Sequence, residues 1–92
     1  MAEIVQVTVE AVRGQCPVFE VGDRLLLRDQ EILLQESTPE TLCIHALGCI
    51  YGTVLFARRG EPGIVHYAQC LDPGPPYAPE GGTVVFRIEK LP

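Results

Sequence analysis

The sequence predicts an α+β domain in which a small antiparallel sheet of four to five strands packs against one long apolar helix. Segments with alternating apolar residues open and close the chain, and a third one precedes the last. Between them lies a stretch from Thr41 to Ala57 that contains no charged residue. A sheet with the helix on one face is the simplest arrangement for this order of strands, helix and strands. The whole chain, residues 1–92, is expected to form a single domain.

The first half of the chain predicts a strand followed by a hairpin. Apolar residues alternate with polar ones over residues 5–11, which is typical of a strand with one face in water. Gly22-Asp23 indicates a turn, because glycine tolerates positive φ and aspartate accepts hydrogen bonds from nearby backbone. Residues 24–28 and 31–35 then flank Asp29-Gln30, and this spacing predicts a short hairpin.

The long helix is expected to begin at Thr38. A threonine at the N-cap accepts a backbone N–H, Pro39 suits the first helical position, and Glu40 would meet the positive end of the helix dipole. The same reasoning places the end of the helix at about Arg58. Arg58 and the arginine that follows it favour the negative end, and Gly60 can supply the cap.

The surroundings of this helix follow from its composition. Gly48 and Gly52 form a stripe of small residues, which predicts the close approach of another backbone, either a strand or a symmetry-related helix. The absence of charge from 41 to 57 predicts burial around most of the helix, by the sheet on one side and a second subunit on the other. A membrane span is the disfavoured alternative, because the stretch is short and carries His45.

The last third of the chain predicts two further strands joined by an ordered loop. Residues 64–70 alternate in the pattern of a strand, and residues 84–89 repeat that pattern near the C-terminus. The segment 72–82 is rich in proline and glycine and is expected to be a loop.

Charge and cysteine content exclude some classes of function. The formal net charge is −5 and the chain has no basic patch, which argues against binding to nucleic acid or to an anionic membrane surface. Residues 1–6 contain no basic segment followed by an apolar core, so no secretory signal is expected. We therefore expect a cytoplasmic protein, in which cysteines act as thiols or ligands rather than as disulfides.

Three of the four cysteines lie at the predicted edges of secondary structure. Cys16 follows the first strand, Cys43 lies in the first turns of the helix and Cys70 ends a strand. Edges of this kind gather at one rim of a layered domain, so these thiols are expected to form a metal site with a fourth ligand from Asp72, His45, water or substrate. Three thiolates suit zinc or an iron–sulfur cluster. Cys49 is about 120° from Cys43 around the helix and is expected to be a core residue.

Several of these residues carry a resemblance to a family of small, uncharacterised bacterial and archaeal proteins with three characteristic cysteines. The matching segments, in order, are Cys16-Pro17-Val18-Phe19, Gly22-Asp23, Pro39-Glu40-Thr41-Leu42-Cys43, Arg58-Arg59-Gly60, Cys70-Leu71-Asp72-Pro73 and Val84-Val85-Phe86-Arg87-Ile88. The resemblance implies that Cys16, Cys43 and Cys70 are the characteristic thiols of this chain and that Cys49 lies outside the pattern. It implies no particular activity.

Three functions are compatible with the sequence. The first is a metal- or iron–sulfur-binding protein with a redox or accessory role and a redox protein partner. The second is a homo-oligomeric interaction module that associates through the apolar helix and uses its cysteines as core residues. The third is a thiol enzyme with Cys43 as nucleophile, activated by the start of the helix. The histidines, His45 and His66, are expected to be structural or exposed rather than ligands.

Overall fold

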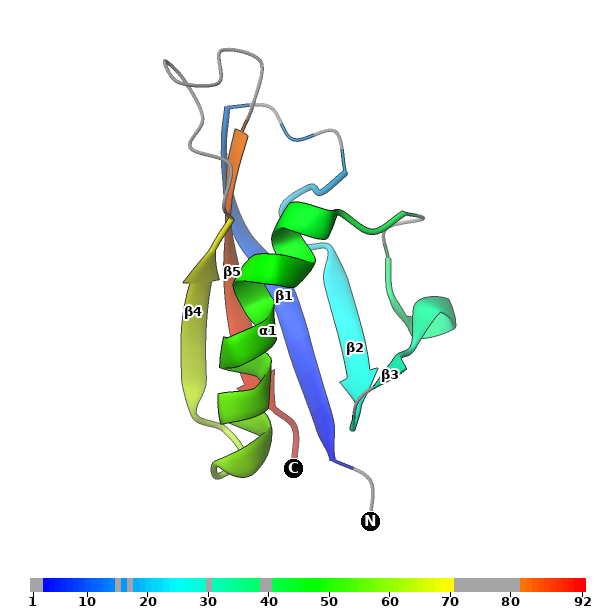
Figure 1. The fold of residues 1–92 in the computed structure, drawn as a ribbon, viewed down its shortest axis with the longest axis vertical. Helices are drawn as coiled ribbons and strands as arrows, with labels where there is room; N and C mark the ends of the chain where they lie inside the picture. The colour runs from blue at the N-terminus through cyan, green and yellow to red at the C-terminus, as the bar shows by residue number, and fades with distance from the viewer. Residues whose placement is uncertain (1–2, 15, 17, 30, 39–40, 71–81) are drawn as a thin grey trace.

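The computed structural model of the chain describes residues 3–14, 16, 18–29, 31–38, 41–70 and 82–92. Within these residues an antiparallel sheet of five strands, in the order β3-β2-β1-β5-β4, is covered on one face by a single α-helix (Figure 1). This arrangement confirms the prediction of an α+β domain. The elements are β1 (Ile4–Gly14), β2 (Arg24–Arg28), β3 (Glu31–Ile32), α1 (Ile44–Arg59), β4 (Val65–Gln69) and β5 (Gly82–Lys90), with a 3-10 turn at Leu34–Glu36.

The central strand, β1, is longer than its sequence pattern predicts. Alternation indicates a strand over residues 5–11, whereas β1 continues to Gly14. The extension arises because β1 and β5 remain paired beyond a bulge between Val9 and Ala11, as far as the pair Gly14 and Gly82. A bulge shifts the alternation by one residue, which hides the second half of the strand from a period-two search.

The hairpin of β2 and β3 is confirmed, but its second strand is shorter than expected. The two strands pair at Leu27 with Ile32 and at Arg28 with Glu31, and β3 ends at Ile32 rather than near residue 35. The turn before β2 also forms as predicted, because Gly22 has φ +94° and the Asp23 carboxylate accepts the Glu20 N–H at 2.9 Å.

The prediction that Thr38 caps the helix is wrong. The Thr38 hydroxyl accepts the Arg24 N–H at 2.8 Å and donates to the Asp23 carboxylate at 3.0 Å, so it completes the edge of β2. The Ser37 hydroxyl accepts the Leu26 N–H of the same strand at 3.2 Å. The helix instead begins at Ile44 with Cys43 as N-cap. Pro39 and Glu40, which were expected in its first turn, lie outside the described residues.

The end of α1 agrees with the sequence prediction. Arg58 and Arg59 occupy the last turn, and Gly60 is the C-cap, with its N–H donating to the Ala57 carbonyl at 3.1 Å. The Lys90 ammonium donates to the Gly60 carbonyl at 3.3 Å, so the last residue of β5 holds this end of the helix. Cationic groups at this position stabilise the negative end of the helix dipole.

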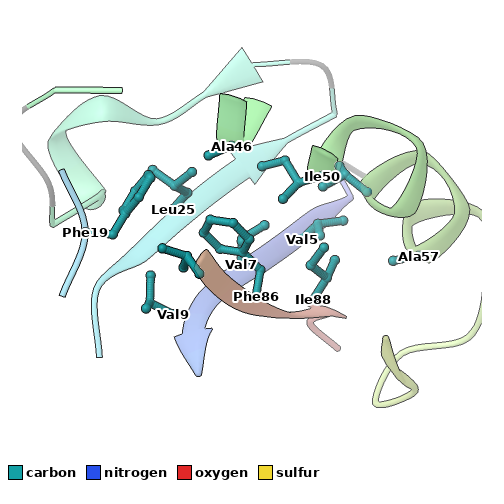
Figure 2. Close-up of a cluster of buried hydrophobic side chains, with 12 residues drawn as sticks. Val5, Val7, Val9, Phe19, Leu25, Ala46, Ile50, Ala57, Phe86 and Ile88 are labelled. Carbon is teal, nitrogen blue, oxygen red and sulfur yellow. The ribbon is translucent and has the colours of Figure 1, made fainter. Parts of the chain in front are cut away.

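The hydrophobic core lies between α1 and the sheet (Figure 2). Phe86 is fully buried in β5, and its ring meets the edge of Phe19 with the ring centroids 5.5 Å apart. The helix contributes one buried stripe at a spacing of three to four residues, which is the period expected for one face. The twelve core residues are Val5, Val7, Val9, Phe19, Leu25, Ala46, Ile50, Val54, Ala57, Val84, Phe86 and Ile88.

Within one copy the helix is buried on the side that faces the sheet, and the predicted burial of its other side by a second subunit stays a prediction. Beyond its buried stripe, α1 exposes Ile44, Tyr51 and Phe56. A Cβ at Gly52 would have no described atom of the chain within 4 Å, so no strand approaches it closely, and the alternative of a symmetry-related helix stays a prediction. Among the described residues, no helix is long and apolar enough to span a bilayer.

Candidate functional site

All four cysteines lie in the described part of the chain, are present as thiols and pack partly buried against the core. Cys16 follows β1, and its sulfur accepts the Phe19 N–H at 3.3 Å. Cys43 is the N-cap of α1. Cys70 comes directly after β4, and its N–H donates to the Val84 carbonyl at 2.8 Å. The predicted placement of Cys70 at the end of a strand is confirmed, whereas Cys43 lies just before the helix rather than inside it.

Cys49 and Cys70 are neighbours across the contact between α1 and β4. The rings of Phe56 and His66 meet edge to face with their centroids 5.3 Å apart, which fixes how the helix sits on the strand. The two elements run in opposite directions (Figure 1). Seven residues back along α1, about 10 Å, lead to Cys49, and four residues forward along β4, about 13 Å, lead to Cys70. Cys49 and Cys70 therefore lie at a similar distance from the contact between Phe56 and His66, in the same direction along the interface of α1 and β4.

The pKa of Cys49 is consistent with the nearness of Cys49 to Cys70. Burial raises the pKa of the Cys49 thiol to about 11, and the negative charges that Cys70 and Cys43 can carry contribute to this rise. The thiol donates to the Ala46 carbonyl at 3.2 Å. Cys49 is therefore a protonated core thiol at neutral pH and a poor nucleophile or metal ligand in this state.

The predicted site of Cys16, Cys43, Cys70 and Asp72 remains a prediction. Over the described ranges, no group of three or more histidine, cysteine, aspartate or glutamate side chains is arranged to hold a metal ion. Asp72 lies outside those ranges. The charges of Cys70 and Cys43 each act on Cys49, but these three described thiols do not form such a group either.

The prediction of Cys49 as a core residue agrees with its packing against the core, but sequence reasoning missed its nearness to Cys70 because it compared positions within the helix only. Cys49 and Cys43 do lie on different sides of α1, as the 120° separation requires. The missing information was the side of the helix that faces β4. A usable signal was present: Cys49 and Phe56 are seven residues apart and so share one face, but only the fold places His66 and Cys70 beside that face.

A groove lies on the other side of the helix, between α1 and the strands β2 and β3. Its volume is about 360 Å³, and it is lined by Leu27, Asp29, Ile32, Leu47, Ile50, Tyr51, Val54, Leu55 and Arg58. Its two charged residues already have partners. Asp29 accepts the Glu3 N–H at 3.0 Å, and the Arg58 guanidinium lies 4.0 Å from the Glu3 carboxylate. The remaining lining is apolar and suits a hydrophobic side chain rather than a charged ligand.

The largest exposed apolar side chains concentrate on α1 and β4. Ile44, Tyr51 and Phe56 on the helix are 77%, 67% and 69% exposed. Tyr67 on β4 is 59% exposed, and Ile64 just before that strand is also exposed. Phe56 lies against β4, whereas Tyr51 lines the groove on the other side of α1, so the exposed side chains of the helix are divided between two surfaces. His45 on α1 is exposed, in agreement with its expected position.

Comparison of the chain with protein-family models, with curated proteins and with solved structures finds no match. The resemblance to the three-cysteine family therefore stays an expectation that rests on the sequence segments quoted above.

Proposed function

We propose that this chain is a small homo-oligomeric interaction module whose partner is a second copy of itself. The observation that carries this proposal is the edge strand β4, where Tyr67 is exposed on one face of the sheet and Phe56 of α1 is exposed beside His66 on the other. A domain of this length buries only about 60–65% of the surface of its unfolded chain, so association with another copy adds burial that the isolated chain lacks.

The position of the thiols supports the same proposal. All four cysteines pack against the core, and free cysteine behaves there as a small apolar residue. The net charge of the chain indicates through which surface two copies can associate. Each copy carries a net charge of −5, so close approach favours a surface without charged residues. β4 is such a surface, because Val65–Gln69 contains no Asp, Glu, Lys or Arg, and His66 is its one titratable side chain apart from Tyr67.

Sedimentation velocity of the purified protein at concentrations from the micromolar to the millimolar range tests this proposal. Reversible self-association predicts a weight-average sedimentation coefficient that rises with concentration toward that of a dimer. A single species of 10.1 kDa at every concentration would reject the proposal.

A second candidate is the thiol-based metal or iron–sulfur protein, and it is supported by the positions of Cys16, Cys43 and Cys70 next to the ends of β1, α1 and β4. Thiolates bind zinc and iron–sulfur clusters, and the proposed ligands are Cys16, Cys43, Cys70 and Asp72. Because thiol ligands must be deprotonated, metal binding would release protons.

Elemental analysis and a visible absorption spectrum of anaerobically purified protein separate the two candidates. The metal proposal predicts near-stoichiometric zinc or iron that falls in Cys70→Ser, with the oligomer unchanged. Metal-free protein with an intact oligomer would leave only the interaction module.

A further inference from the structure

The outer edge of β4 is unpaired within the described part of the chain. β4 is the last strand of the sheet order, so it pairs with β5 on one side and with none of the described strands on the other. Proteins protect such edges with charged side chains, proline, bulges or very short strands. Val65–Gln69 contains no proline or charged residue, and its pairing with β5 runs without a register shift. The opposite edge, β3, is only two residues long and carries Glu31.

The register of β4 shows which backbone groups point outward. In an antiparallel pair, hydrogen-bonded and non-hydrogen-bonded residue pairs alternate. Cys70 donates to Val84 of β5, so His66 and Ala68, which share its parity, also direct their N–H and C=O groups toward β5. The N–H and C=O groups of Val65, Tyr67 and Gln69 therefore point away from the sheet.

We infer that β4 pairs with β4 of a second copy around a two-fold axis at Tyr67, an inference that rests on the proposed self-association. An antiparallel edge is complementary to itself, because a two-fold rotation places each outward N–H opposite an outward C=O. With the axis at Tyr67, the two Tyr67 residues exchange both hydrogen bonds. Val65 of each copy then faces Gln69 of the other, so all three outward residues are paired and the two sheets become one.

This arrangement also covers the apolar side chains beside the edge. Phe56 lies on the β4 side of α1, where it touches His66, so the two helices flank the axis on the same face of the joined sheet. Tyr67 of each copy lies on the opposite face, as a directly opposed cross-strand pair. Aromatic cross-strand pairs stabilise antiparallel sheets. No like charges oppose each other across the axis, because β4 carries none.

The backbone part of the inference is tested with Tyr67→Pro. Proline removes the outward N–H of residue 67 and leaves the pairing of β4 with β5 intact, because edge strands tolerate proline where the N–H faces outward. Sedimentation velocity should show a folded monomer for Tyr67→Pro, with unchanged circular dichroism. Tyr67→Val, which keeps the N–H, is the matched control and should remain a dimer.

The register is tested with two double variants at the same positions. Val65→Lys with Gln69→Glu places opposite charges across the axis twice, whereas Val65→Lys with Gln69→Lys places like charges there. The inferred register predicts a dimer dissociation constant at least about tenfold higher for the second variant than for the first at low salt.

The outcomes separate this inference from the proposed function. A wild-type protein that is monomeric at every concentration overturns both. A dimer that persists in Tyr67→Pro, or that does not distinguish the two charge variants, overturns the pairing of β4 and leaves self-association through another surface.

Discussion

Cys49 shows how one residue's surroundings decide its chemistry. It lies on the side of α1 that faces β4, its thiol donates to the Ala46 carbonyl, and Cys43 and Cys70 are close enough for their charges to act on it. Burial and these charges act in the same direction, because both disfavour the thiolate. Cys49 is therefore expected to be the least reactive of the four thiols at neutral pH.

The ionisation of Cys49 predicts a pH dependence of stability. Its pKa rises from 9.0 to about 11 in the folded chain, so its contribution is fully present below pH 9.0 and is lost as pH rises through about 11. In that window the unfolded chain has lost a proton that the folded chain keeps, and this favours unfolding. Urea denaturation should show the stability difference between wild type and Cys49→Ala shrinking from pH 9.0 to 11. A difference that stays constant over this range would contradict the assigned burial.

Phe86 is expected to be the most sensitive position in the core. It has no exposed surface and its ring meets the edge of Phe19, so Phe86→Ala should lower the free energy of unfolding by about 3–5 kcal/mol. Phe56→Ala, at an exposed position, is the matched control and should change the stability of the monomer by much less. Chemical denaturation at low protein concentration measures both variants. Equal losses would mean that Phe86 does not occupy the core.

At the scale of elements, two hydroxyl groups complete the edge of β2. Ser37 and Thr38 accept the N–H groups of Leu26 and Arg24, which would otherwise need a strand partner. Replacing one of them leaves a backbone donor without its acceptor. Ser37→Ala should therefore cost about 1 kcal/mol without reducing the helical circular dichroism signal, because Ser37 does not cap α1. A loss of helical signal would show that this segment belongs to the helix after all.

Two glycines are expected to respond in opposite directions to alanine. Gly52 lies in α1, where an added methyl group would meet no atom within 4 Å, so Gly52→Ala should stabilise the chain by about 0.5–1 kcal/mol through helix propensity. Gly22 has φ +94°, which an L side chain rarely adopts, so Gly22→Ala should destabilise the chain. Thermal denaturation of the two variants checks the pair. A destabilising Gly52→Ala would place another backbone against the outer face of α1.

The local elements of this chain can be predicted from its sequence better than the contacts between those elements. The strand from 65 follows from alternation, the strand from 24 from its spacing around Asp29, the turn at Gly22 from glycine, and the end of α1 near Arg58 from charge and Gly60. The start of α1 cannot be predicted in this way, because Thr38 satisfies the requirements of an N-cap and of a strand-edge acceptor equally well. Only the position of β2 decides between them. The neighbourhood of Cys49 and Cys70 escapes prediction for a similar reason, since it depends on how α1 lies on β4.

At the scale of the whole molecule, the thin core favours association of two copies, whereas the net charge of −5 on each copy opposes it. The core holds twelve buried apolar residues from one helix face, the sheet and Phe19, while large apolar side chains remain on the outside. Joining two sheets at β4 would bury part of that surface where the chain has no charge. The stability of the protein is then expected to rise with its concentration, as for any equilibrium between monomer and dimer.

Amide hydrogen exchange at two neighbouring residues of β4 tests the shared edge most directly. The Ala68 N–H points toward β5 and should be protected at every protein concentration, whereas the Tyr67 N–H points outward. If two copies join at β4, protection of the Tyr67 amide should increase with protein concentration. If the Tyr67 amide exchanges as fast as an exposed amide even at millimolar protein, the edge of β4 is not an interface between copies.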